Sequence, residues 1–408
     1  MVIKKIPLIK LQFFLLTLLS IFNVLALLYE DLKVMLYYGT LLCSLLLLGI
    51  SVFKAFKYRK NNLLLRKNIL YVFLLIWTVC IILKGFQFNY NYIRDITLSP
   101  YVLFPYILIF FTRFFRIEDF NDILKSIHIV NIIYLVIILL TLIVDSQKLI
   151  INNYVEDSIK YLCFPNFFMF ISFSKLTKKQ KILSVIVFII GFVIAILAAR
   201  RSLVWIFAWT FMVFVFINYL NRNSGKLKKL ILIIMTLTIG FGITIVYNLF
   251  FETIFGELVE RLDNDTRGAV LRDFYKDMDT KGWIMGRGIT GEYNLFETDY
   301  VFGSDDEMLE SRNIIEAGYL NLILKGGLIY LIPFTIIILI ALRNGIFKSK
   351  NYYIKVCSGF IILYIAECIP AGVFMFNIRF FLLWYCIAMC WNTKVINATD
   401  QEIEKHLV

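Results

Sequence analysis

The sequence predicts an all-α protein that crosses a membrane many times, and three observations support this prediction. Hydrophobic residues make up 60% of the 408 residues and charged residues 17%, with a mean hydropathy of +0.78, whereas soluble domains are about half apolar and about a quarter charged. Apolar runs long enough to cross about 30 Å of hydrocarbon recur along the whole chain. Basic residues gather between these runs, as they do in cytoplasmic loops. We therefore expect one membrane domain over residues 1–408.

The lengths of the apolar runs predict twelve membrane spans. Nine precede a long polar segment: Leu8–Leu28, Val34–Phe53, Asn68–Leu83, Leu98–Phe115, Ile127–Val144, Tyr161–Ser174, Ile182–Ala199, Leu203–Leu220 and Leu230–Phe250. The first is too long for the apolar core of a secretory signal, and the sixth is short enough to be tilted or re-entrant. Three more follow the polar segment: Gly327–Leu342, Ile354–Ile369 and Val373–Trp391.

The distribution of charge orients these spans. A net charge of +13 could indicate nucleic-acid binding, but the segment 251–312 holds fifteen acidic and seven basic residues, so the positive excess lies in the short loops. If the basic loops are cytoplasmic, both termini are inside and the 251–312 loop is outside, and the alternation is consistent throughout. The tail at 392–408 is then cytoplasmic and expected to be solvated. We expect no nucleic-acid partner.

The stretch after the loop is expected to hold two helices. Asn313–Leu342 could be one long helix, or two helices broken at Gly326-Gly327. The basic residues that follow should be cytoplasmic, which requires a single crossing. We therefore expect residues 327–342 to cross the membrane and residues 313–325 to form an outer helix at the membrane interface.

Arginines are the sharpest candidates for chemistry. Arg200 and Arg201 stand between two spans with almost no loop, on the side where arginines are disfavoured. Guanidinium groups pair bidentately with phosphate, so this pair would suit a lipid-linked pyrophosphate; the alternative is snorkelling to lipid headgroups. Loop arginines could serve the same purpose: Arg261, Arg267, Arg272 and Arg287.

Other features of the loop give weaker signals. A short helix is expected at Ala269–Met278, and Gly286–Gly291 is expected to be a flexible turn, with amides approaching a sugar or phosphate as the alternative. The acids of 305–307 could bind Mg²⁺ or Ca²⁺, although adjacent acids more often form a solvated face. Glu316 follows the loop, and partial burial would make it a plausible general base; the alternative is a carboxylate favoured by the helix dipole.

Glu367 and Arg379 flank the last outer turn and could pair or line a cavity. All seven cysteines lie in apolar segments, so no disulfide framework is expected.

In order and spacing, these elements resemble the superfamily of O-antigen polymerases and O-antigen ligases, bacterial envelope glycosyltransferases with a GT-C-like membrane fold. Residues 199–202 are similar to the family's Ser-Arg turn, and Arg267 followed by the Gly-rich residues 284–288 is similar to its outer loop. The runs 316–320 and 327–329 are similar to the element that precedes the next span. Ligases open that element with histidine, whereas this chain has Glu316, which favours a polymerase.

The resemblance implies an inverting glycosyl transfer without a nucleotide sugar, a metal or any other cofactor. The donor would be a glycan on undecaprenyl pyrophosphate, and the acceptor another lipid-linked repeat unit, at the outer face of the bacterial inner membrane. Glu316 and Arg201 would be catalytic. Pyrophosphate would be bound by Arg200, Arg201, Arg267, Arg272 and Arg287, and sugar by Gly288, Tyr293 and Tyr319.

The product would be O-antigen, capsule or exopolysaccharide, made beside a flippase and a chain-length regulator. One alternative is an O-antigen ligase or a protein O-oligosaccharyltransferase of the same superfamily. The alternative from another class is a lipid-linked oligosaccharide flippase or transporter, which usually shows internal repeats and broken, charged helices at the membrane midplane.

Overall fold

The computed structural model describes residues 8–27, 29, 32–57, 68–99, 101–144, 152–198, 200–220, 266–296, 311–370 and 372–407. Regular structure in these ranges is helical except for two short strands, β1 (Tyr293–Asn294) and β2 (Ser311–Arg312), which pair antiparallel. Six of the described helices are long and apolar enough to cross a membrane. The structure therefore confirms an all-α membrane protein, and the span predicted at Leu230–Phe250 lies outside the described residues.

Most predicted spans within the described ranges form helices where they were expected. These are α1 (Leu8–Ala26), α2 (Lys33–Lys57), α4 (Ile69–Leu83), α7 (Phe120–Val144), α10 (Lys178–Leu197), α11 (Arg201–Leu220) and α17 (Tyr352–Cys368). Polar side chains mark several helix starts. The Asn68 side chain accepts hydrogen bonds from the first amides of α4, and Thr177 and Gln180 form a capping box on α10. Such caps satisfy amides that have no partner within the helix.

The fourth predicted span is not one helix. The chain is helical in α5 (Tyr90–Leu98) and α6 (Leu103–Ile107), and a 3-10 turn at Leu108–Phe114 follows. In the sequence, Pro100 stands between α5 and α6. Proline has no N–H to donate and disfavours helical conformation in the residue before it. The span predicted at Leu98–Phe115 therefore lies in a bent pair of helices and not in one straight helix.

The short sixth span is a buried element. α8 (Asn152–Ser158) continues through a π-helical turn at Ile159–Cys163 into α9 (Pro165–Ile171), and every residue of α9 is buried. Asn166 of α9 accepts a hydrogen bond from Asn131 of α7 at 2.8 Å and donates one to the Ser184 carbonyl of α10 at 2.9 Å. This segment can be short because neighbouring helices surround it.

The helix after the loop is broken at its glycine pair. α16 (Gly318–Arg343) contains Gly327 with φ +69°, and a Cβ there would lie 2.2 Å from the Ile284 carbonyl oxygen. Only glycine fits both this backbone angle and this contact. The part before the break starts at Gly318, and most of its residues are buried. The outer helix predicted at 313–325 is thus shorter than expected and largely enclosed by protein.

The last segments fold back onto the helices. They are α18 (Ile378–Trp391), α19 (Thr393–Asn397) and α20 (Asp400–Leu407). Asn351 donates to the Val395 and Ala398 carbonyls at 2.7 and 3.0 Å, and Lys175 pairs with Glu404 at 2.7 Å. The described part of the tail is therefore docked on the protein, which corrects the expectation of a solvated tail.

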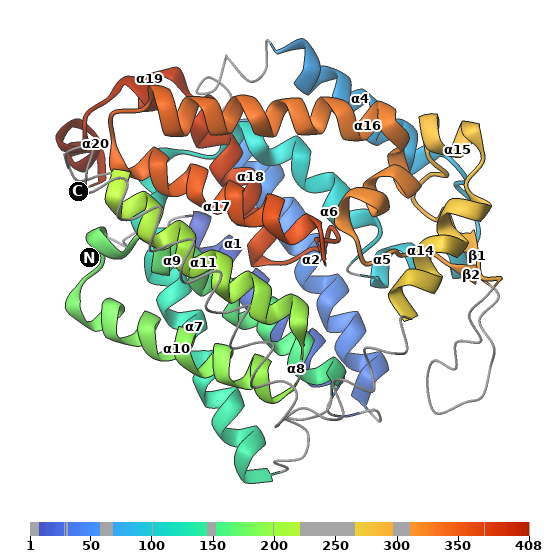
Figure 1. The fold of residues 1–408 in the computed structure, drawn as a ribbon, viewed down its shortest axis with the longest axis horizontal. Helices are drawn as coiled ribbons and strands as arrows, with labels where there is room; N and C mark the ends of the chain where they lie inside the picture. The colour runs from blue at the N-terminus through green and yellow to red at the C-terminus, as the bar shows by residue number, and fades with distance from the viewer. Residues whose placement is uncertain are drawn as a thin grey trace.

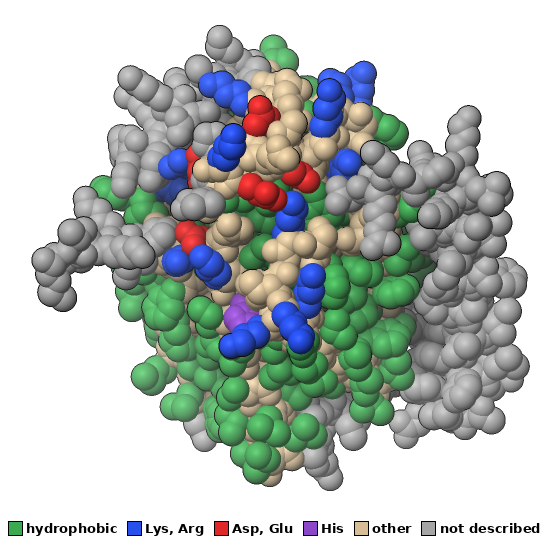
Figure 2. Space-filling model, turned by 90° about the vertical axis from the view of Figure 1, so that its left-hand side faces the viewer, with side chains coloured by type: hydrophobic (Ala, Val, Ile, Leu, Met, Phe, Trp, Pro, Cys, Tyr) green, Lys and Arg blue, Asp and Glu red, His purple; other side chains and the backbone are tan. Residues whose placement is uncertain are grey.

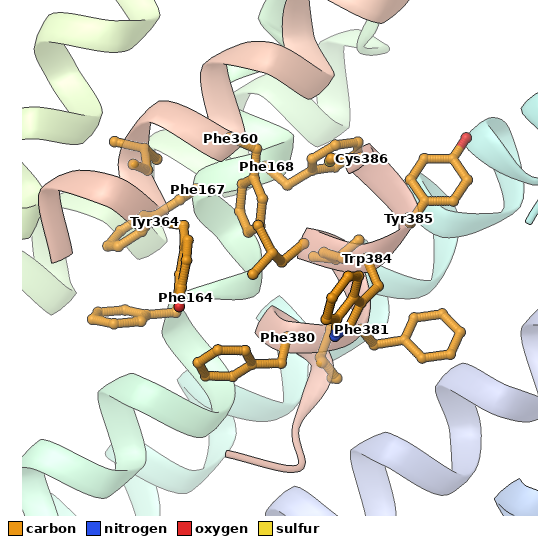
Figure 3. Packing of buried hydrophobic residues seen from close by; sticks show 14 of the residues in the cluster. Phe164, Phe167, Phe168, Phe360, Tyr364, Phe380, Phe381, Trp384, Tyr385 and Cys386 are labelled. Atoms are coloured by element: carbon orange, nitrogen blue, oxygen red, sulfur yellow. The ribbon is translucent and has the colours of Figure 1, made fainter. Parts of the chain in front are cut away.

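Polar elements gather at opposite ends of the helices. α14 (Thr266–Asp277), α15 (Thr280–Met285) and the strand pair lie at one end, and α19 and α20 at the other (Figure 1). On the face that carries α19 and α20, charged side chains crowd the upper part and hydrophobic side chains cover the lower part (Figure 2). Aromatic rings pack the core between the ends. Among them, Phe168 meets Phe360 edge-on with 5.6 Å between ring centroids (Figure 3).

Candidate functional site

The tight turn before α11 belongs to a charged cluster. Arg200 Nη1 lies 3.1 Å from Glu156 Oε2 of α8, and Lys160 pairs with the other carboxylate oxygen of Glu156. The Arg200 carbonyl accepts from the amides of Leu203 and Val204, so this residue also starts α11. We call Glu156, Asp157, Lys160 and Arg200 the α8–α11 cluster. It gives Arg200 the partner that an arginine at this position was expected to need.

Asp157 follows Glu156 in the chain and is within electrostatic range of Lys160 and Arg200. It is half-buried, and burial raises its pKa to about 6, although the positive charges of Lys160 and Arg200 oppose that rise. Sequence reasoning missed Glu156 and Asp157. The signal was the spacing of Glu156 and Lys160, four residues apart in a segment predicted to be an outer loop, which puts their side chains on one helix face.

A buried ion pair lies close to the cluster. Arg379 of α18 pairs with Glu367 of α17, and both side chains are almost fully buried, as the sequence allowed. The Arg379 guanidinium carbon lies 5.2 Å from the ring centroid of Phe164 and 4.6 Å from that of Phe380. Tyr161 is within electrostatic range of both Arg379 and Asp157, which connects the pair to the α8–α11 cluster.

The glycine-rich stretch of the loop is packed between helix ends. The amides of Arg287, Gly288 and Ile289 donate to the carbonyls of Leu324, Lys325 and Ile81, respectively. A Cβ on Gly288, whose φ is +88°, would lie 2.6 Å from the Lys84 carbonyl oxygen. We call residues 286–291, with Lys84, Lys325 and Gly327, the glycine joint. Its backbone is engaged by protein, so this stretch is a rigid contact and not the flexible turn that was expected.

The cations of the glycine joint are also engaged. Lys325 is 1% exposed, and its Nζ donates to the Gly291 carbonyl at 2.9 Å. Lys84 donates to the Gly286 carbonyl, and burial, aided by nearby Lys281 and Arg287, lowers its pKa. Arg287 pairs with Asp277 and donates to the Glu292 carbonyl at 2.7 Å. These contacts hold the loop to α4, α14 and α16.

The other predicted site residues are dispersed. Tyr293 is 0% exposed in a small core with Phe274, so its ring does not reach solvent. Tyr319 is 39% exposed and lies beside Tyr275. Arg272 is exposed on α14, which confirms the helix expected near 269–278.

Glu316 is exposed two residues before α16 begins, so it lacks the partial burial that would have favoured a general base. It is near Gly372, because a Cβ on Gly318 would lie 2.2 Å from the Gly372 carbonyl oxygen. Some candidates fall outside what the structure describes: Arg261, the acids of 305–307, and the side chains of Arg201 and Arg267.

The structure thus brings Arg200 together with two acids and a lysine that the sequence did not single out, and it assigns Gly288 and Arg287 to a structural contact. Comparisons with protein-family models, with curated proteins and with solved structures find no match to this chain.

Proposed function

We propose that this chain polymerises oligosaccharide repeat units linked to undecaprenyl pyrophosphate, as an inverting glycosyltransferase. The observation that carries the proposal is the α8–α11 cluster. Arg200 lies in the tight turn before α11 and pairs with Glu156, which also pairs with Lys160. Two cationic groups are therefore held together at this turn. Guanidinium and ammonium groups are the partners that phosphates prefer. Charge stabilisation of this kind is often the largest contribution to transition-state stabilisation.

The proposal includes a topology of twelve crossings, with both termini in the cytoplasm and the 251–312 loop outside. The support for this topology is that loops predicted to lie on the same side of the membrane contact one another. Segments predicted to be outer meet one another, as Lys84 meets Gly286 and Arg200 meets Glu156. Segments predicted to be inner do the same, as Lys54 pairs with Asp119 at 2.7 Å.

In the proposed reaction, Arg200 and Arg201 bind the pyrophosphate of the donor. Glu316 is a candidate to meet the acceptor unit because it is exposed at the same end of the helices. Confinement of both lipid-linked substrates to one membrane supplies the proximity that a two-substrate transfer needs.

A flippase or transporter is the second candidate, and one observation favours it. Helices are broken between α5 and α6 and at Gly327, and the buried Arg379–Glu367 pair lies next to Phe164, which follows the π turn after α8. Broken helices and buried charges are features of transport proteins. In this chain, however, the ion pair lies at helix ends, at the last residues of α17 and the first of α18.

Deletion of the gene and gel analysis of surface polysaccharide test the proposal. A product of single repeat units supports a polymerase, and loss of all lipid-A-linked glycan supports a ligase. Complementation with Arg200→Ala should reduce long-chain product by about 100-fold or more, the loss typical of removing one transition-state donor, while Arg200→Lys should restore part of it. Long-chain product at the wild-type level with both Arg200→Ala and Arg201→Ala would contradict the proposal.

A further inference from the structure

Asp157 stands apart from the other members of the α8–α11 cluster. Among the residues that the structure describes, Glu156 forms the ion pairs with Arg200 and Lys160, and no ion pair or hydrogen bond engages the Asp157 carboxylate. The side chain is half-buried and lies next to Glu156 in the chain. The Asp157 carboxylate therefore forms no structural ion pair with the residues that the structure describes, and it is free to accept a proton during a reaction.

The groups that face Asp157 come from several elements. Lys160 and Glu156 flank it on its own helical segment, and Arg200 faces it from the turn before α11. Three tyrosines lie within electrostatic range of Asp157: Tyr37 of α2, Tyr101 before α6 and Tyr161 of the π turn. Burial outweighs the two cations, so the carboxylate holds a proton more tightly than one on the surface does.

The position of Asp157 suits a base that works next to a departing anion. The proposed function places the pyrophosphate on Arg200, with Lys160 next to it, and both cations lie within electrostatic range of Asp157. A general base is most effective when its affinity for a proton is near the working pH and the base is still ionised there. Glu316, in contrast, is exposed to solvent before α16.

We propose that Asp157 is the proton acceptor of the transfer reaction, an inference that rests on the proposed function. The hydroxyl oxygen of the acceptor unit forms a new bond to the anomeric carbon of the donor glycan. The bond from that carbon to the pyrophosphate oxygen breaks at the same time, and the pyrophosphate leaves with the electron pair next to Arg200 and Lys160. The hydroxyl proton passes to the Asp157 carboxylate and then to water. Glu156 is a positioning residue, because it acts by holding Arg200 and Lys160.

The test uses the purified full-length chain in lipid nanodiscs and repeat units on undecaprenyl pyrophosphate extracted from the deletion strain. Initial rates are measured from pH 4.5 to pH 8.5. The wild-type rate should fall as the pH drops below about 6, because the base becomes protonated there. Asp157→Asn should lower the rate by about 100-fold or more, the usual contribution of a general base, and should remove this acid limb.

Two further measurements separate a catalytic role from a structural one. Binding of undecaprenyl pyrophosphate should be unchanged in Asp157→Asn, because the groups proposed to bind the pyrophosphate are Arg200 and Arg201. Asp122→Asn is the matched control: this half-buried acid pairs with Lys10 at the opposite end of the helices, and its loss should leave both the rate and the acid limb as in the wild type.

An Asp157→Asn protein with the wild-type rate and acid limb would overturn the inference, as would loss of the acid limb in Glu316→Gln alone. If Asp157→Asn does not fold, the rate and pH profile of Asp157→Glu test the inference instead. A displaced carboxylate should keep the acid limb and lower the rate by about tenfold or more, whereas an unchanged rate would overturn the inference. Failure of the wild-type chain to form polymer would instead contradict the proposed function, whatever the variants do.

Discussion

The glycine joint and the α8–α11 cluster lie at the same end of the helices and use their charged groups in opposite ways. In the glycine joint, Lys84 and Lys325 each donate to a backbone carbonyl of the loop, so the cations hold the chain together. In the α8–α11 cluster, Arg200 and Lys160 share the Glu156 carboxylate, and the Asp157 carboxylate near them forms no ion pair with any residue that the structure describes. The polarity of the long loop therefore does not by itself locate a functional site, because the cations of the glycine joint hold the loop to the helices.

The largest effect expected from this difference is at Gly288. Its φ of +88° and the 2.6 Å approach of a Cβ to the Lys84 carbonyl predict that Gly288→Ala loses about 1–3 kcal/mol from backbone strain, and more from the steric overlap. The midpoint of thermal unfolding in detergent measures this loss. Binding of undecaprenyl pyrophosphate by the folded fraction should be unchanged.

Gly49→Ala is the matched control for the Gly288 variant. Gly49 lies within α2, and a Cβ there would meet nothing within 4 Å. Alanine favours a helix over glycine by about 1 kcal/mol, so this variant should be as stable as the wild type or more stable. A Gly288→Ala protein with wild-type stability and weakened pyrophosphate binding would instead assign the glycine joint to the binding site.

The sequence was sufficient to predict helices because each depends on a local apolar run, and six described helices are long and apolar enough to cross a membrane. It also predicted the break at Gly327, which depends on a residue type, and allowed the Arg379–Glu367 pair, whose members are close in the chain. It did not predict the break in the fourth span, although Pro100 was a usable signal.

The site was harder to predict because its members are distant in sequence. Arg200 was visible as an arginine in a tight turn, but its partner Glu156 lies on α8, and only the packing of the helices brings them together. The contacts of Gly288 could not be predicted for the same reason. Its amide donates to the Lys325 carbonyl and its Cα lies close to Lys84, and both residues are distant from it in the sequence. The sequence left open whether Glu316 is partly buried, and the structure shows it exposed.

The next largest effect is expected at the ion pair that fastens the loop to α14. Arg287 pairs with Asp277, and Asn294 also donates to Asp277 at 2.9 Å. Removing the charge with Asp277→Asn should cost about 1–3 kcal/mol, the range for hydrogen bonds to charged groups. Thermal unfolding of Arg287→Lys, Asp277→Asn and the double variant gives the coupling between them. If the losses of stability in the two single variants add up to the loss in the double variant, the Arg287–Asp277 pair has no structural role. Weakened pyrophosphate binding with no loss of stability would contradict a structural role as well.

The smallest effect expected is a gain of stability at the α8–α11 cluster. The pKa of Asp157 in the folded chain, about 6, is above its ordinary value of 3.8. A raised carboxyl pKa means that folding favours the protonated form, so the contribution to stability is complete below about pH 4 and is lost as the pH rises through 6. At pH 8 the ionised carboxylate therefore opposes folding, by an amount on the order of 1 kcal/mol after allowance for solvent screening.

Asp157→Asn, which stays neutral at every pH, should therefore unfold at a higher temperature than the wild type at pH 8, and at the same temperature at pH 4. Asp122→Asn should give no gain at pH 8, because its carboxylate pairs with Lys10. A destabilised Asp157→Asn protein at pH 8 would show that Asp157 helps to hold the cluster together. Greater stability combined with lost turnover would mean that the carboxylate is retained at a cost to folding, as expected of a residue kept for its chemistry.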